Sequence, residues 1–282
     1  MKEKITPCLW FNGQAGDAAA RYCAAFKRSR ITAQSPIVTS VEIAGQSLTL
    51  LDGGPMYKPN ASISFYVGCE SAEEFDQAWK ALSEGGTVVS APAKTPWSEK
   101  YGWVTDPFNV SWQLGVQKTG DIKQKITPYL MFTGGQYGRA DDAIKHYDTV
   151  FKSKSPEGVV RYGPEDAPEH PGYVRHAELE LLNYKFMLSE VQSAAVPFTE
   201  GVSLTVHCEN QAEVDYYWSK LTEGGKESMC GWLKDRFGVS WQIIPTMLAK
   251  LMSDPAKAGK AAQAFMGMRK LDIEQLVQAS IA

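Results

Sequence analysis

Two similar apolar runs, one in each half of the chain, predict the same opening strand. Residues 5–11 read Ile-Thr-Pro-Cys-Leu-Trp-Phe, and residues 126–132 read Ile-Thr-Pro-Tyr-Leu-Met-Phe. Each run leads through a glycine-containing turn into a predicted helix. The first helix carries Tyr22 and Phe26 four positions apart, on one face, and we expect Asp17 to cap it. The second helix has the same pair of rings and an acidic start at Asp141 and Asp142.

Alternation of apolar and polar residues predicts further strands in each half. They lie at residues 35–43, 46–51 and 63–67, and again at 173–181, 184–189 and 202–206. A helix follows in each half, at 72–84 or 211–223, and ends at a Gly-Gly pair that suits a left-handed C-terminal cap.

A motif that occurs twice closes each half. Residues 101–114 and 230–243 both contain a Gly-Trp step, a turn that begins with Asp, and an alternating strand. In that strand Trp112 opposes Gln113, and Trp241 opposes Gln242. The chain is therefore a duplication, and each half is predicted to hold two modules of one strand, one helix and three strands.

This interpretation divides the chain into three parts. Residues 1–120 and 121–245 form the two predicted domains, and residues 246–282 form a helical tail that packs on the second domain. Asp254-Pro255 predicts one helix start in the tail, and Asp272 with Gln275 predicts another.

Composition and charge exclude several classes of function. The 282 residues are 44% hydrophobic and 22% charged, which suits compact domains, and the net charge of −3 leaves no basic face for nucleic acid. No apolar run is long enough to cross a bilayer, and residues 1–4 precede no signal-type apolar core. We therefore expect a cytoplasmic protein with neither nucleic-acid nor membrane partners.

The five cysteines are scattered and form neither a CxxC pair nor a cluster of zinc-binding spacing. In a cytoplasmic chain they are expected to be free, mostly buried thiols.

Strand alternation also predicts which side chains can face a ligand. Ser64 and Tyr66 share one face of their strand, and Phe65 lies on the other, which must lie under the helices. The polar face then lines either solvent or a cavity enclosed by a curled sheet. Glu42, Glu178 and Glu180 also lie in strands; Glu42 and Glu180 are the candidates for acid–base catalysis, with solvent exposure as the alternative.

Residues 5–11, 126–132, 101–114 and 230–243 together resemble the PhnB-like proteins, whose domain carries the family name 3-demethylubiquinone-9 3-methyltransferase. This is a branch of the vicinal oxygen chelate superfamily, with glyoxalase I, bleomycin-resistance proteins and extradiol dioxygenases. The resemblance implies an α+β fold of two tandem glyoxalase-like domains, in which paired βαβββ modules form a curled sheet with helices outside. It also implies an internal pseudo-dimer, with a homodimer of such chains as a further assembly.

In metal-dependent relatives, His, Gln and Glu side chains supply the ligands. The resemblance places other residues at those positions in this chain: Thr6 or Pro7, Thr127 or Pro128, Ser62, Gly201, Gln113 and Gln242. Hydroxyls and neutral amides bind transition metals weakly, so we expect no metal and no cofactor.

These observations favour a small-molecule-binding protein that takes an aromatic ligand. The predicted ligand-binding residues are Trp10, Ser64, Tyr66, Trp103, Gln113, Met131, Thr205, Trp232 and Gln242. For Gln113 and Gln242, a purely structural hydrogen bond is the alternative role.

Two alternatives stay open. One is an enzyme of the same superfamily, either a lyase or isomerase or a methyltransferase, and the other is a non-catalytic scaffold. Against a methyltransferase, the chain has no glycine-rich turn after a parallel strand of the kind that binds S-adenosylmethionine, and the cluster at 134–138 is explained as a module turn.

Overall fold

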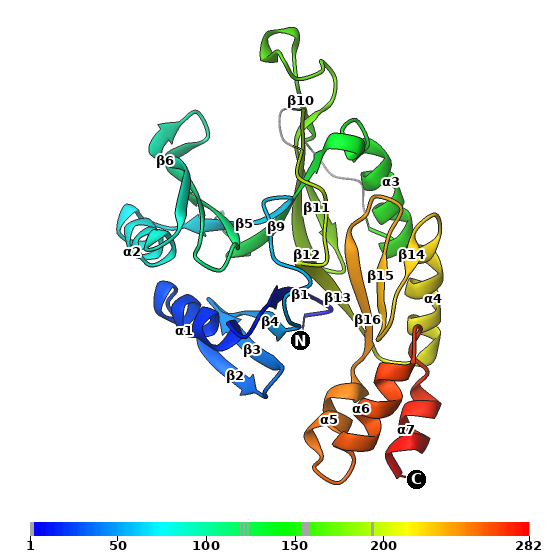
Figure 1. Cartoon of the computed structure of the whole chain (residues 1–282). Coiled ribbons are helices and arrows are strands. Elements are labelled where there is room, and N and C mark those ends of the chain that lie inside the picture. Colours follow the sequence, from blue (N-terminus) through cyan, green and yellow to red (C-terminus); the bar gives the residue numbers. More distant parts are fainter. Residues whose placement is uncertain are drawn as a thin grey trace. The chain divides into compact units, whose positions relative to one another are not determined.

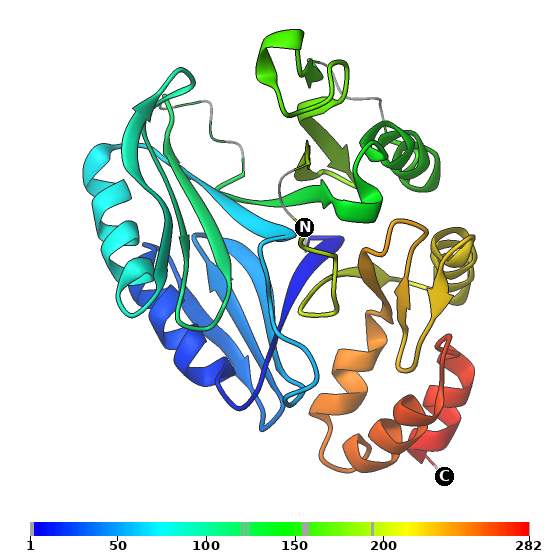
Figure 2. The same cartoon turned by 45° about the horizontal axis from the view of Figure 1, so that its top comes forward.

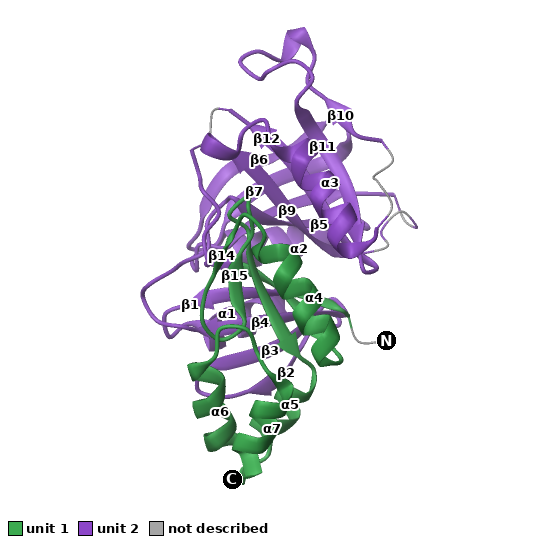
Figure 3. Ribbon diagram, turned by 90° about the vertical axis from the view of Figure 1, so that its right-hand side faces the viewer, with its two compact units in different colours: residues 1–6, 203–282 green, residues 7–202 purple. Residues whose placement is uncertain are grey.

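The computed structural model describes residues 3–118, 120, 122, 124–153, 158–192 and 195–281. The chain forms two compact units. Unit 1 joins Met1–Thr6 to Ser203–Ala282, and unit 2 is Pro7–Val202 (Figure 3).

The order of elements confirms four βαβββ modules. The first is β1 (Ile5–Phe11), α1 (Ala15–Ala25), β2 (Arg30–Gln34), β3 (Val38–Ile43) and β4 (Gln46–Asp52). The second is β5 (Ile63–Cys69), α2 (Ala72–Ser83), β6 (Thr87–Thr95), β7 (Ser98–Thr105) and β8 (Ser111–Val116). The third is β9 (Ile126–Thr133), α3 (Ala140–Phe151), β10 (Val160–Arg161), β11 (Val174–Leu181) and β12 (Tyr184–Val191). The fourth is β13 (Val202–Cys208), α4 (Gln211–Thr222), β14 (Lys226–Glu227), β15 (Trp232–Lys234) and β16 (Ser240–Pro245).

Unit 2 contains a complete eight-stranded sheet made by the second and third modules. Its order is β10-β11-β12-β9-β5-β8-β7-β6, and the two modules meet where β5 runs antiparallel to β9 (Figure 1). Helix α2 packs on β7 and β8, and α3 packs on β11 and β12. The modules that share this sheet thus come from different halves of the sequence duplication.

The rest of unit 2 is the first module, in the order β1-β4-β3-β2, with β1 parallel to β4. Helix α1 packs on β3 and β4 and lies beside α2 (Figure 2). Apolar side chains of the helices and strands build this core: Tyr22 of α1 and Trp112 of β8 are fully buried, with ring centroids 5.1 Å apart.

Unit 1 holds the fourth module, in the order β14-β15-β16-β13, with β13 parallel to β16. The tail that follows is helical, as predicted: α5 (Met247–Ser253), α6 (Ala258–Gly267) and α7 (Ile273–Ile281). Its helices enclose a small apolar core of their own, made by Leu248, Leu251, Ala261, Leu271 and Leu276. Within the part of the chain that the structure describes, no helix has the length and apolar character needed to cross a membrane.

One helix start differs from the prediction and one agrees with it, and at both a strand carboxylate accepts the first helix N–H. Helix α3 begins at Ala140 with Asp141 and Asp142 in its first turn, as predicted. Helix α1 begins at Ala15, so Asp17 lies in its first turn, and the backbone N–H of Ala15 donates instead to the carboxylate of Asp52 (3.1 Å). At the equivalent place in α3, the N–H of Ala140 donates to Glu190 (3.0 Å). A carboxylate at the end of a neighbouring strand satisfies the first helix amides without a local cap.

Both predicted helix starts in the tail are capped by their aspartates. The Asp254 carboxylate accepts the N–H of Ala256 (3.0 Å) and its carbonyl accepts the N–H of Ala258 (2.8 Å), so Asp254 opens a turn that leads into α6, although α6 itself begins only at Ala258. Asp272 does start α7, where its side chain accepts the N–H of Gln275 (2.9 Å).

Candidate functional site

Strand alternation divides the β5–β9 sheet into an apolar face and a polar face, as predicted. Phe65 and Trp112 lie on the helix side and are fully buried. Gly102 also faces the helices, since an added Cβ would meet the ring of Trp79 in α2. The opposite face, called the polar face below, carries Ser62, Ser64, Tyr66, Tyr101, Trp103, Ser111, Gln113, Thr127, Tyr129, Met131, His176, Glu178, Lys185, Met187 and Ser189.

A chain of hydrogen bonds crosses the polar face through Gln113. The Gln113 side-chain N–H donates to the hydroxyl of Ser64 (2.8 Å), and the Tyr101 hydroxyl donates to the Gln113 carbonyl (2.7 Å). Ser64 and Gln113 are 2% and 7% exposed, although they lie on the face away from α2 and α3. These polar groups are therefore shielded from water by neighbouring side chains on the same face.

Tyrosine rings supply much of that cover. Tyr66 lies directly over Gly115, where an added Cβ would overlap its hydroxyl. Burial is the main cause that raises the pKa of Tyr66 to about 12, and the negative charge of nearby Glu178 adds to it. Burial, with Tyr129 and Tyr66 as neighbours, likewise raises the pKa of Tyr101. Near neutral pH these phenols remain protonated and act as hydrogen-bond donors.

The polar face also carries a row of ionisable groups on β9, β11 and β12. The Tyr129 hydroxyl lies 3.3 Å from Nδ1 of His176. Nε2 of His176 lies 3.9 Å from Oε1 of Glu178, whose other oxygen pairs with Nζ of Lys185 at 3.3 Å. The interaction with His176, followed by the charge of Lys185, lowers the pKa of Glu178 to about 2 against the effect of burial. Glu178 is thus a carboxylate at all ordinary pH values.

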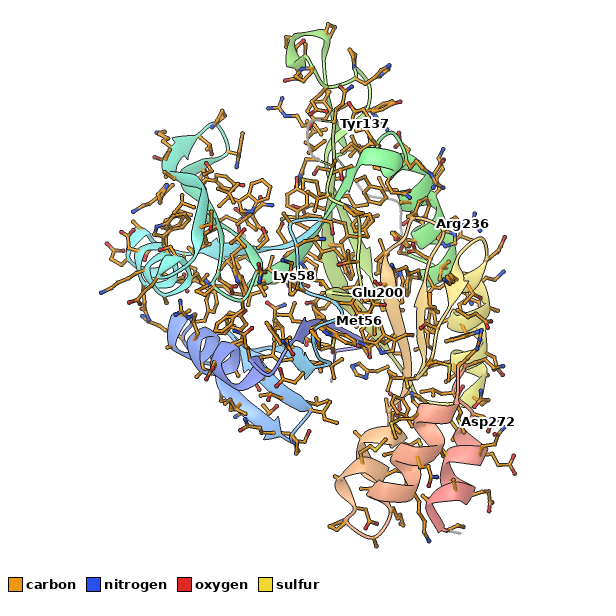
Figure 4. All side chains as sticks on the ribbon, in the orientation of Figure 1. Met56, Lys58, Tyr137, Glu200, Arg236 and Asp272 are labelled. Carbon is orange, nitrogen blue, oxygen red and sulfur yellow. The ribbon has the colours of Figure 1, made fainter. Side chains whose placement is uncertain are left out.

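The other predicted residues of unit 2 lie at different distances from this network. Trp103 donates its indole N–H to Ser111 on the polar face (2.7 Å), and Met131 is 9% exposed there. Trp10 belongs elsewhere: its indole N–H donates to the carbonyl of Gly54 (2.8 Å), and its ring meets Tyr57 edge to face. Gly54 and Tyr57 belong to the loop between β4 and β5. The same loop carries Met56 and Lys58, which are labelled near Glu200 in Figure 4.

Unit 1 repeats part of the arrangement. The Gln242 side-chain N–H donates to the hydroxyl of Ser203 (2.9 Å), as Gln113 does to Ser64. Thr205 and Trp232 are the register partners of Gln242 on its two neighbouring strands. The structure thus brings the three predicted residues of this unit together.

The two catalytic candidates from the sequence lie outside these networks. Glu42 forms an ion pair with Arg30 (2.7 Å) at the β2–β3 pairing. Glu180 lies on the polar side of β11, as His176, Glu178 and its register partner Lys185 do, but it is exposed there. Neither side chain joins the hydrogen-bonded groups of the polar face. Glu180 is exposed to solvent, and Glu42 takes part in a surface ion pair.

The residues at the expected metal positions do not fit a transition metal. Ser62 donates its hydroxyl to Asn60 (2.6 Å), and Gln113 is engaged by Ser64 and Tyr101. Over the described ranges, no group of three or more His, Cys, Asp and Glu side chains could hold a metal ion. Neutral oxygen donors without imidazole or carboxylate bind such ions weakly. The prediction that the protein needs no metal stays untested.

Solved structures of a glyoxalase I share the fold of this chain. Glyoxalase I from Zea mays has a TM-score of 0.59 at 12% identity, covering 89% of this chain and 96% of that chain. A point mutant of the same maize enzyme has a TM-score of 0.58 at 11% identity, over 87% and 92%. A PhnB protein from Bacillus cereus is 29% identical over 41% of this chain and 100% of its own, with a TM-score of 0.39. The comparison with curated proteins found no match.

The fold is therefore that of a tandem glyoxalase-like protein, as the sequence predicted. The sequence profile of one family, described as 3-demethylubiquinone-9 3-methyltransferase, matches twice, at residues 3–115 and 124–244. The chain belongs to this family.

Sequence reasoning missed several residues of the polar face, among them Tyr101, Tyr129 and His176. Alternation from Thr127 through Met131 would have placed Tyr129 on the same face as Met131. Tyr101 stands at the first position of the repeated motif. His176 gave no such signal, because its closeness to Tyr129 depends on how β9, β12 and β11 pair.

Proposed function

We propose that the polar face of the β5–β9 sheet binds a small aromatic molecule that carries a hydroxyl or carbonyl group. The observation that supports this most is the buried chain from Ser64 through Gln113 to Tyr101. This chain lies on the face away from the helices. If that buried face were only a packed core, apolar side chains would be expected there instead of hydrogen-bonded polar ones. Sites for small organic ligands combine such aromatic walls with a few fixed polar groups.

The polar face offers a ligand both aromatic surface and hydrogen-bonding groups. The rings of Tyr66, Tyr101 and Tyr129 offer flat apolar surface. The Tyr66 hydroxyl can donate a hydrogen bond to a ligand oxygen, whereas the Tyr101 hydroxyl already donates to Gln113 and the Tyr129 hydroxyl lies against His176, so their oxygens can accept one from a ligand hydroxyl. The Gln113 amide, held by Ser64 on one side and Tyr101 on the other, has one further donor and one further lone pair. A ligand with a ring and one oxygen would satisfy both kinds of group.

A pair of compounds that differ only in a hydroxyl tests this function. We expect p-nitrophenol to raise the melting temperature and to bind in calorimetry, because a ligand of the folded state stabilises it. Nitrobenzene should bind about tenfold more weakly, since it lacks a hydrogen bond worth about 1 kcal/mol or more. Equal binding of the two compounds, or no binding of either, would overturn the proposal.

Matched variants locate the site. Gln113→Leu should weaken p-nitrophenol binding, whereas Gln242→Leu, the same change in the second copy of the motif, should leave the unit 2 site intact. Thermal melts of both variants without ligand show whether each still folds. Equal losses of affinity in the two variants would place the binding site outside the polar face.

A further inference from the structure

The ionisable row on β9 and β11 has the order of groups that proton transfer requires. Tyr129 places its hydroxyl 3.3 Å from Nδ1 of His176, and Glu178 stands on the other side of the imidazole, 3.9 Å from Nε2. A carboxylate beside Nε2 favours the tautomer with its proton there. Nδ1 then presents its lone pair to the Tyr129 hydroxyl and is free to act as a base.

Lys185 fixes the third member of the row. Its ammonium group pairs with Oε2 of Glu178 at 3.3 Å, which leaves Oε1 turned toward His176. Val160 of β10, the register partner of His176 on the other side, adds no charge. Among the described residues, ion pairs join the imidazole to Glu178 and, through it, to Lys185.

The row is also accessible from the ligand side. The side chains of His176 and Glu178 are 35% and 47% exposed, whereas Tyr129 is largely covered and burial raises the pKa of its hydroxyl. A ligand held by the tyrosine rings would therefore meet the Tyr129 hydroxyl at the buried end of the row. The imidazole at the partly exposed end can hold the added proton.

We propose that Tyr129, His176 and Glu178 form a proton-transfer site that removes the hydroxyl proton of a bound phenol or enol. The ligand O–H bond breaks and its proton passes to the Tyr129 oxygen, while the proton of Tyr129 passes to Nδ1 of His176. The ligand becomes an anion and His176 an imidazolium, so charge and atoms balance without an oxidant or reductant. Glu178 is a positioning residue that stabilises the imidazolium.

The reverse step defines the class of reaction that such a site supports. A proton returned to carbon instead of oxygen converts an enol into its keto form, which is an isomerisation. The inference rests on the proposed binding function, because a ligand oxygen must first reach the tyrosine hydroxyls.

p-Nitrophenol tests the proton transfer directly, since its anion absorbs visible light and its neutral form does not. At a pH where the free compound is mostly neutral, we expect the wild-type protein to raise the ionised fraction of bound nitrophenol about tenfold, as a cation within reach of an acidic group does. His176→Gln should still bind nitrophenol in calorimetry but should lose the visible band. Glu178→Gln should bind it and show a weaker band.

His207→Gln is the matched control, because His207 lies on a strand of unit 1 and hydrogen-bonds a hydroxyl, that of Thr6 (3.0 Å). It should keep both binding and the visible band. Thermal melts confirm folding of each variant. If the wild type does not bind nitrophenol, both the binding function and this inference fail. Binding without a visible band, or a band that survives in His176→Gln, overturns the proton-transfer inference alone.

Discussion

The two copies of the closing motif share a scaffold and differ in what they add to it. In the first, the Asp106 carboxylate accepts the N–H of Val110 (2.9 Å) and the indole N–H of Trp112 (2.9 Å). In the second, Asp235 accepts the equivalent groups of Val239 and Trp241, at 3.0 Å and 2.9 Å. The aspartate, the turn and the tryptophan are therefore the structural part of the motif.

The differences lie at the start of the motif. Tyr101, which donates to Gln113, is replaced by Cys230 in the second copy. The segment after the Gly-Gly cap is also longer in the first copy, residues 87–100 against residues 226–229, and forms a long hairpin that carries the exposed Trp97. In the second copy, the N–H groups of Cys230 and Gly231 donate to carbonyls of the tail. One copy thus extends the polar face, and the other anchors helices.

The largest expected effect tests whether the scaffold is equal in both copies. Trp112→Ala and Trp241→Ala each remove a fully buried indole and should each cost about 3–5 kcal/mol in the free energy of unfolding. Denaturant unfolding followed by circular dichroism measures the loss. A cost below about 1 kcal/mol for either variant would contradict its place in a core.

The glutamine pair should separate the two copies. Gln113→Leu leaves both Ser64 and the Tyr101 hydroxyl without their partner, which should cost about 1–3 kcal/mol. Gln242→Leu removes the bond to Ser203 from a less buried side chain, and we expect a smaller loss. Denaturant unfolding measures both losses. Equal losses of stability in the two variants would contradict the expectation that the glutamine of the first copy is the more tightly held one.

Tyr101→Phe isolates the hydroxyl that only the first copy has. It deletes one buried hydrogen bond and keeps the ring, so the expected loss is about 0.5–1.5 kcal/mol. The affinity for p-nitrophenol should fall as well, since the Gln113 amide loses one of its supports. Unchanged stability and affinity together would show that this bond does not organise the polar face.

The smallest effect is a pH dependence at Glu178. Its pKa is lowered to about 2 in the folded protein from an ordinary 4.5, so its contribution to stability is present above the unfolded value and is lost as pH falls toward 2. Because the side chain is 47% exposed, solvent screening keeps this contribution to about 1 kcal/mol or less. Glu178→Gln should flatten the melting temperature across that acid range, whereas a curve parallel to the wild type would contradict the shift.

Much of the fold followed from the sequence, because local pattern carries it. Alternation placed Phe65 and Trp112 under the helices, and the repeated runs at 5–11 and 126–132 marked the first and third modules. Helix starts were less predictable where the cap came from a distant strand, as Asp52 does for α1. The predicted domain boundaries at residues 120 and 245, and the predicted pseudo-dimer, stay predictions.

The candidate site was only partly predictable, for a topological reason. Ser64, Tyr66 and Gln113 lie in the second module, and alternation alone selected them. Their closeness to Tyr129 depends on β5 pairing with β9, with Ser64 opposite Tyr129. No local pattern specifies that partner, since any module of the chain offers a similar first strand.

Unit 1 is built from both ends of the chain, and this sets an order of events during synthesis. The Lys4 carbonyl accepts the N–H of His207 (2.9 Å), and the Lys4 ammonium pairs with Glu213 (2.7 Å). At typical ribosomal speeds of about 5–20 residues per second, Lys4 emerges roughly 10–40 s before these partners exist. Residues 63–191, by contrast, contain every strand of the unit 2 sheet. The nascent chain can therefore complete that sheet before the partners of Lys4 have been synthesised. The pairing of the first residues with the segment around His207 and Glu213 is then a late step of folding.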